Sequence, residues 1–313
     1  HLTALMTLMI QSGLIVDVGY TECIVTPVIE GVTNFDSVQF APLGGKAIHE
    51  SILCELRKLK AKIKTSNETT ILSDDFTLDD KILENIKVRT CFVAPFERRE
   101  YLRKNDSENI ENSPRDVQYP IDGSRILELP GVVREKAAEI LFEEFENEQS
   151  IATLILDALL RCPLDSRKIL ASNIVLVGGS CMLPGFKYRL MMELKHLVNH
   201  PRYKEKIFFK SFLFHNPPCK ENYVSWLGAS IFGSTDAINT RCISREQYLK
   251  TNGKVLVDWC DWYPPKNSIV DMFYSLNENL LSEVTGVDEG LIGDEGWETV
   301  VGVCVTVVGD NVC

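Results

Sequence analysis

The chain contains short apolar runs that end at glycine turns, and this pattern predicts buried strands. Such runs cover residues 14–18, 23–29 and 174–177 and are rich in β-branched side chains. The first two lie on either side of a turn at Gly19, so they predict a hairpin, which residues 38–41 continue. The same reasoning predicts short strands over 91–94 and 207–213.

Apolar residues spaced three and four positions apart predict helices in the segments between these strands. The predicted helices cover residues 2–10, 47–58, 132–146, 151–162, 185–198, 222–233 and 244–249. A further helix begins at residue 79 and runs into the strand at 91–94. Segments 62–80 and 96–118 are polar and rich in turn-forming residues, so we expect loops there.

Acidic residues are concentrated near the C-terminal end. The 313 residues carry a net charge of −11, and residues 267–313 contain nine Asp or Glu and no Lys or Arg, so the remainder carries −2. This charge disfavours a nucleic-acid partner. No apolar run approaches the ~20 residues of a membrane span. The ten cysteines show no paired metal-ligand spacing, which favours reduced thiols.

Two strand ends and one helix carry residues suited to phosphate chemistry. The first strand ends in Asp17 and Gly19, where backbone N–H groups can face a phosphate and the carboxylate a hydrated Mg²⁺. A later strand is followed at once by Gly178 and Gly179, which allow a ligand to approach the backbone closely. Lys87 lies on a helix beside a strand, where it can contact a nucleotide. Taken singly, the same residues are also explained by ordinary turns and, for Lys87, by a solvated helix face.

These three motifs, in this order and followed by Trp226-Leu-Gly-Ala-Ser230, resemble the actin family. The similarity covers roughly residues 1–250 and includes the segments 119–123, 161–174 and 243–248. Within the family, the chain resembles the divergent actin-related class at the pointed end of the dynactin filament. The segments that suggest this are 43–49, 86–93, 148–157 and 258–260.

The resemblance implies an actin-like (ribonuclease H-like) α/β fold around a nucleotide cleft. We expect an incomplete form of this fold, because the first phosphate hairpin and most of one half precede the matching residues. The implied parts are a hinge helix region over 1–13, an inner α/β subdomain over 14–41 and 138–224 with the second phosphate loop and the adenosine loop, an outer inserted subdomain over 42–137, the C-terminal part of the other half over 225–275, and an acidic, disordered or non-family tail over 276–313.

ATP or ADP with Mg²⁺ is the cofactor that the resemblance implies. The nucleotide-binding residues carried over by it are Asp17, Gly19, Thr21, Lys87, Gly178, Gly179 and Met182. Of these, Asp17 is expected to face the metal indirectly, through water.

Departures from the family pattern affect catalysis. Where actins have Asp-x-Gly-Asp-Gly in the second phosphate loop, this chain has Tyr20 and Thr21 at the last two positions. Tyr20 replaces the carboxylate that helps to arrange the metal-bound water, and both side chains crowd a phosphate approach that glycine leaves open. Around the adenine, the family's Arg, Glu and Lys are replaced by Glu84, Val88 and Asn222. Hydrolysis requires a positioned nucleophile and positioned charge, so we expect no catalytic residues and no rapid ATP hydrolysis.

The function implied by the resemblance is structural. A non-catalytic subunit would cap the pointed end of dynactin's actin-like filament and bridge it to the other pointed-end subunits, with dynein and cargo adaptors as indirect partners. It would act in the cytoplasm, in the cytoskeleton. Insertions at 60–80 and 96–118 would block further addition and recruit partners. Two alternatives stay open: a nuclear actin-related subunit of a chromatin remodeller, and an ATPase or sugar kinase of the same fold superfamily.

Overall fold

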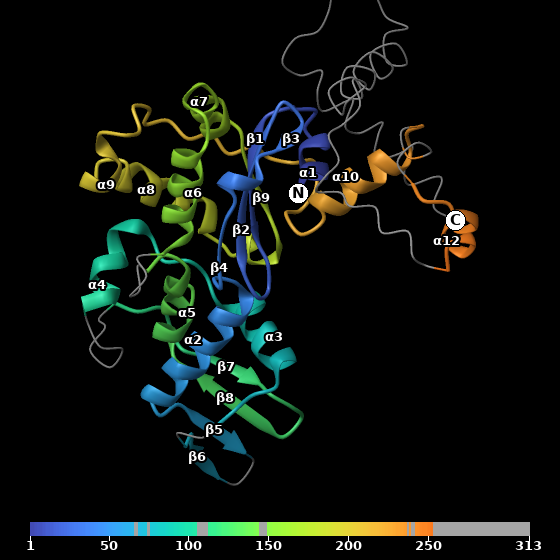
Figure 1. Cartoon of the computed structure of the whole chain (residues 1–313). Coiled ribbons are helices and arrows are strands. Elements are labelled where there is room, and N and C mark those ends of the chain that lie inside the picture. The colour runs from blue at the N-terminus through green and yellow to red at the C-terminus, as the bar shows by residue number, and fades with distance from the viewer. Residues whose placement is uncertain are drawn as a thin grey trace, which may run out of the picture.

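The computed structural model describes residues 1–252, apart from 66–67, 74–75, 105–111, 144–148, 237 and 239–241. The described residues form two β-sheets with helices packed around them (Figure 1). The acidic tail predicted over 276–313 and the last part of the segment 225–275 lie outside the described residues.

The first sheet is built around the predicted hairpin. Strand β1 (Gly13–Val18) pairs antiparallel with β2 (Cys23–Ile29), and β2 also pairs with β3 (Val32–Thr33) and β4 (Gln39–Ala41). On its other side, β1 pairs in parallel with β9 (Ile174–Val177). The parallel pairing brings the carboxyl ends of β1 and β9 to one edge, which is where ligands bind in α/β sheets.

Successive residues of β1 point to opposite faces of this sheet, as the pleat requires. Leu14, Val16 and Val18 belong to the large hydrophobic core. Ile15 belongs to a smaller apolar cluster on the other face. Both faces of β1 are therefore buried, which explains why its sequence is almost continuously apolar.

Helices cover both faces of the sheet (Figure 1). Helices α6 (Ile151–Arg161) and α7 (Leu164–Ser172) pack on the face of the large core, and α8 (Phe186–Leu197) packs against α6. Helices α1 (Leu2–Met6) and α10 (Val224–Gly233) pack together on the opposite face. The short helix α12 (Arg245–Lys250) follows α10.

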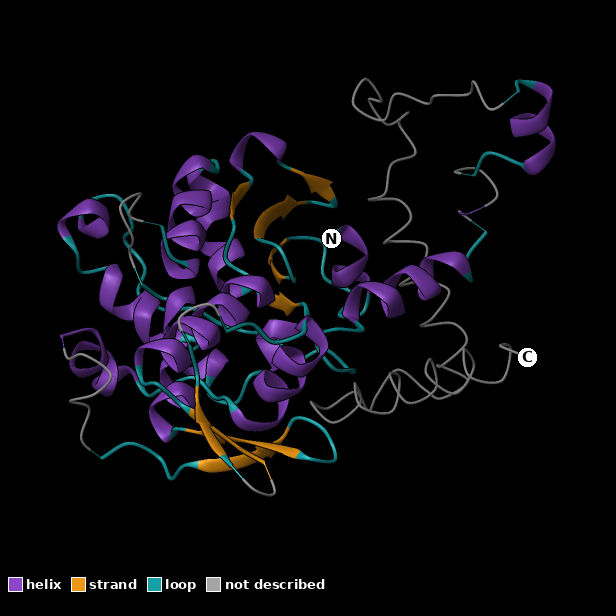
Figure 2. Ribbon diagram, turned by 90° about the horizontal axis from the view of Figure 1, so that it is seen from below, coloured by secondary structure: helices purple, strands orange, loops and turns teal. Residues whose placement is uncertain are grey.

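The second sheet is antiparallel, with strand order β6-β5-β8-β7. Its strands are β5 (Lys62–Thr65), β6 (Thr69–Ile71), β7 (Val117–Pro120) and β8 (Arg125–Leu129). Figure 2 shows helices between the two groups of strands. Helices α2 (Gly45–Lys58) and α3 (Asp80–Thr90) pack against each other and contribute to the same large core as this sheet.

The two predicted loops contain regular structure. Segment 62–80 contains β5 and β6, which pair with each other, and Ile63 of β5 and Leu72 just after β6 are buried in the core. Segment 96–118 contains α4 (Arg99–Lys104), whose Leu102 is buried. The predicted helix over 132–146 is shorter than expected. It consists of α5 (Gly131–Lys136) and a separate 3₁₀ turn at Glu139–Leu141.

The strands predicted over 91–94 and 207–213 are wrong. The Phe92 N–H bonds the Arg134 carbonyl (3.1 Å), and the Val93 N–H bonds the Pro184 carbonyl (2.9 Å). This extended segment therefore bonds to helix α5 and to the loop before α8 instead of joining a ladder. The segment 207–213 forms no strand either. The residue that follows it, Phe214, makes an isolated parallel bridge with Ile174.

A buried ion-pair network holds α8 to its neighbours. The Arg189 side chain is fully buried and donates to both carboxylate oxygens of Glu139 (2.7 Å each) and to Glu193 (2.9 Å). It also donates to the Ala94 carbonyl (2.8 Å) and stacks over the Phe142 ring. Every one of these acceptors lies on α8, on the 3₁₀ turn or on the extended segment after α3. The network therefore fixes the relative positions of three parts of the chain.

Candidate functional site

Asp17 and Gly178 meet where β1 and β9 end. Asp17 is opposite Val177 in the parallel ladder, and Gly178 follows with a φ of 99°. A Cβ at Gly178 would stand 2.4 Å from the Val18 carbonyl oxygen and 2.9 Å from Oδ1 of Asp17. Only glycine permits this approach. Gly179 comes next, with open space where a Cβ would lie.

The Asp17 carboxylate is partly exposed and contacts the side chain of His1. The distance from Oδ2 of Asp17 to Nε2 of His1 is 3.1 Å, and Nδ1 of His1 lies 2.7 Å from the Thr26 hydroxyl. If Nε2 carries the proton, it donates to Asp17, and Nδ1 accepts from Thr26. This leaves Asp17 as an oriented carboxylate at the edge of the sheet.

The turn between β1 and β2 is fixed to the start of helix α2. The N–H of Gly45 bonds the Gly19 carbonyl (2.9 Å), and the N–H of Lys46 bonds the Tyr20 carbonyl (2.7 Å). A Cβ at Gly44 would stand 2.6 Å from the same Tyr20 oxygen, so glycine is required for this approach. Turn carbonyls thus satisfy N–H groups that a helix N-terminus leaves unpaired. Thr21 is exposed on this turn.

Three side chains pack closely around Gly45, and we call the group Gly45, Tyr20, Lys87 and Ser180 the cradle. A Cβ at Gly45 would stand 3.0 Å from Nζ of Lys87, 3.2 Å from Cδ2 of Tyr20 and 3.6 Å from Oγ of Ser180. The Ser180 hydroxyl donates to the Gly19 carbonyl (3.1 Å). The cradle therefore joins the turn, α2, α3 and the glycine pair after β9.

Charged groups of α3 surround Lys87 in the cradle. Nζ of Lys87 donates to Oε2 of Glu84 at 2.5 Å, and Nε2 of His49 lies 3.0 Å from the same oxygen. Burial and the Lys87 ammonium lower the pKa of His49, although Glu84 and Asp80 oppose this shift. Burial and the Asp80 carboxylate raise the pKa of Tyr20.

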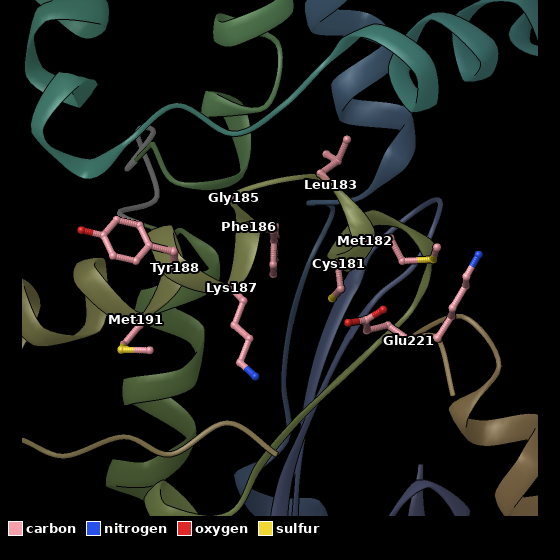
Figure 3. A pocket seen from close by; sticks show the side chains of 10 residues that line it. Cys181, Met182, Leu183, Gly185, Phe186, Lys187, Tyr188, Met191 and Glu221 are labelled. Atoms are coloured by element: carbon pink, nitrogen blue, oxygen red, sulfur yellow. The ribbon is translucent and has the colours of Figure 1, made fainter. Parts of the chain in front are cut away.

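An open pocket of about 620 Å³ begins beside the glycine pair (Figure 3). Figure 3 shows Tyr188 and Met191 at one end of this pocket, and Met182 and Glu221 at the other. The Glu221 carbonyl accepts from the Gly178 N–H (3.1 Å), so the pocket is anchored to the end of β9. The sequence reasoning missed Tyr188 and Met191. Their spacing of three places both on one face of α8, and this spacing is the sequence signal that could have found them.

The structure thus brings most of the predicted residues into one region. Asp17, Gly178 and Gly179 share the edge of the sheet, whereas Lys87 lies in the adjoining cradle and Met182 lines the pocket. Their role in binding a nucleotide stays a prediction. Within the described residues, no group of three or more His, Cys, Asp or Glu is placed to hold a metal ion. No helix in the described part of the chain is long and apolar enough to cross a membrane.

Sequence comparison gives the family. Residues 4–259 match the actin family. Over 280 residues, the chain is 29% identical to "Actin-related protein 10" of Dictyostelium discoideum, which covers 76% of this chain and 55% of that protein. It is 26% identical over 253 residues to "Putative actin-29" of the same organism, and this match covers 80% of this chain and 60% of that protein. The chain therefore spans little more than half the length of these relatives. With its two sheets and a family match over most of its length, the chain is a member of the actin family.

Proposed function

We propose that this chain is a structural actin-related subunit that occupies the pointed end of dynactin's actin-like filament. There it contacts the filament subunit and bridges to the other pointed-end subunits, and so supports dynein-driven transport in the cytoplasm. The support is the family membership, the similarity to an actin-related protein and the sequence segments that resemble the dynactin class.

The β1–β2 turn is the observation that carries the non-catalytic part of this proposal. Tyr20 stands where the family has its second carboxylate, and its ring reaches the cradle at Gly45. Asp17, at the end of β1 just before the turn, contacts His1. Accelerating hydrolysis requires a water that is held in line and charge placed for the transition state. A tyrosine at this position supplies neither.

The remaining groups are those that a nucleotide would use. The open backbone at Gly179 leaves room for phosphate oxygens, and Lys87 lies in the adjoining cradle. Asp17 would face a water of a bound Mg²⁺, and the pocket beside Met182 would take the base. When bound, the metal supplies positive charge that offsets the phosphates. ATP or ADP would then link the ends of β1 and β9 and would not be hydrolysed.

The inserted elements support a capping role. Strand β6 lies at the edge of the second sheet and exposes Ile71, and α4 lies in the second insertion. Unpaired strand edges are ready surfaces for a partner. We propose that these two insertions block addition of a further filament subunit and contact the pointed-end partners.

Affinity capture of the tagged chain from cell extract tests the partner assignment, with the tag alone as the control. Recovery of the actin-like filament subunit together with other dynactin components would support it. Recovery of chromatin-remodelling subunits would replace it with the nuclear alternative. Recovery of neither would leave family membership as the only supported assignment.

Single-turnover measurement with γ-labelled ATP tests the non-catalytic part, with conventional actin as the positive control. We expect phosphate release no faster than in the Asp17→Asn variant. Release at an actin-like rate that the substitution abolishes would show that the chain is an ATPase.

A further inference from the structure

The segment that follows helix α9 (Pro201–Lys204) exposes apolar side chains beside the first sheet. Ile207 and Phe212 are buried in the large core and fix the segment to it. Phe208 and Leu213 point away from that core, with 82% and 55% of their surface exposed. Phe208 is the most exposed large hydrophobic side chain in the described part of the chain. The segment therefore presents an apolar surface to water.

The backbone of this segment is open as well. Among the described residues, no backbone carbonyl accepts from the N–H groups of residues 208–212. The first paired N–H group is that of Leu213, which donates to the Ala171 carbonyl (3.0 Å). Unpaired N–H groups beside a sheet are ready sites for a further extended segment. Side chains and backbone thus suit the same kind of occupant.

The exposed charges around Phe208 are mostly positive, and we call residues 204–213 the basic edge. Lys204, Lys206 and Lys210 are exposed, and Glu205 is the one acidic residue of the edge. Pairing the basic edges of two copies of this chain would bring lysines together, which opposes self-association here. The chemistry fits an extended segment that is apolar at its centre and acidic at its ends.

We propose that residues 294–310 of the same chain dock on the basic edge as an extended segment. Residues 300–308 are mostly β-branched, which favours extended pairing. Carboxylates stand on both sides of this run, and none of residues 267–313 is Lys or Arg. The acidic residues of the docking segment are Asp294, Glu295, Glu298 and Asp310. The docked segment would keep the basic edge from pairing with other chains.

The chain is long enough for this contact. Residues 253–299 lie between the last described residue and the apolar run. At about 3.3 Å per residue they can span about 150 Å. A domain of about 250 residues is about 45 Å across, so every face of it is within reach. Because both surfaces belong to one chain, their effective concentration is on the order of 1 mM. A contact with a Kd of about 0.1 mM would then be formed about nine-tenths of the time.

Hydrogen exchange of the full chain, measured by mass spectrometry, tests the proposal. We expect the amides of residues 208–212 to exchange about tenfold more slowly than in a variant without the acidic ends, because a contact formed nine-tenths of the time leaves them open for a tenth of it. The variant carries Asp294→Asn, Glu295→Gln, Glu298→Gln and Asp310→Asn. The matched control removes the same charge outside the docking segment, by Asp271→Asn, Glu278→Gln, Glu283→Gln and Asp288→Asn, and should keep the protection. Equal exchange in the native chain and in the first variant, or equal loss in both variants, would overturn the proposal.

A second measurement needs no variant. A carbodiimide joins lysines to carboxylates that already touch, and a mixture of nitrogen-15-labelled and unlabelled chains separates links within one molecule from links between two. We expect Lys206 or Lys210 to be linked to the docking segment within one molecule, and the yield to fall at about 1 M salt, where charges are screened within about 3 Å. Links that join only labelled to unlabelled chains would assign the basic edge to a second copy. That result, or no link between the basic edge and residues 294–310, would overturn the contact and leave the proposed function unaffected.

Discussion

Replacing Arg189 by methionine removes the centre of the buried ion-pair network. The change deletes four hydrogen bonds of 2.7 to 2.9 Å and leaves the Glu139 carboxylate, which is 1% exposed, without its bidentate partner. Removing one member of a buried pair costs about 3–5 kcal/mol, because the other charge stays buried and uncompensated. At about 2–4 °C per kcal/mol, we expect the midpoint of thermal unfolding to fall on the order of 10 °C. Circular dichroism at about pH 7 measures this loss.

The pH dependence of the loss identifies its cause. Burial raises the pKa of Glu139 even beside Arg189. In Arg189→Met this pKa rises further, because the compensating cation is gone. A carboxyl group whose folded pKa exceeds its unfolded pKa favours the folded state only while it is protonated, so the variant recovers stability as the pH falls from about 7 to about 5. The difference in midpoint between the native chain and the variant should therefore narrow.

Arg125→Met is the matched control. Its pair with Asp122 is 2.7 Å long but about half exposed, so water screens it and its loss should change the stability little. A loss in Arg189→Met no larger than in Arg125→Met, or a difference that does not narrow in acid, would refute the reasoning.

Three further outcomes follow from local geometry. Gly178→Ala should cost at least about 2 kcal/mol in urea unfolding, because it adds a Cβ 2.4 Å from the Val18 carbonyl at positive φ; an unchanged midpoint would contradict this. Ser150→Ala should cost about 1 kcal/mol, since its hydroxyl caps α6 in a capping box, and chemical unfolding measures it. Burial raises the pKa of the Cys181 thiol well above its ordinary value, so iodoacetamide at about pH 8 should label exposed Cys54 first; equal labelling by peptide mass spectrometry would argue against this burial.

The strands that could be predicted are those buried on both faces. Strands β1 and β9 are continuous apolar runs because helices cover both sides of them. Strand β5 alternates lysines with buried Ile63, and the three residues of its partner β6 are exposed, so neither strand carries a strong apolar signal. The run at 207–213 has the composition of a strand, yet Phe208 is 82% exposed. Composition describes a strand's side chains, whereas a strand also needs a neighbouring edge to pair with.

The sequence predicted where the residues of the candidate site lie, but it did not predict which side chains contact each other there. Asp17 and Gly178 follow from strand ends, because parallel neighbours must finish at the same edge. The contact between His49 and Glu84 joins residues 35 positions apart on two helices, and no local pattern fixes how those helices pack. Sequence therefore identified Lys87, but it did not show that a carboxylate already neutralises it.

Two of the departures from the actin pattern lie together in space. Tyr20 replaces a carboxylate on the turn, and Glu84 replaces an arginine on α3. The two residues meet around His49, which contacts the Tyr20 ring and the Glu84 carboxylate. Restoring a carboxylate at position 20 alone would place it beside Asp80 and Glu84, whose charges already raise the pKa of Tyr20. Repulsion among three carboxylates opposes that reversal.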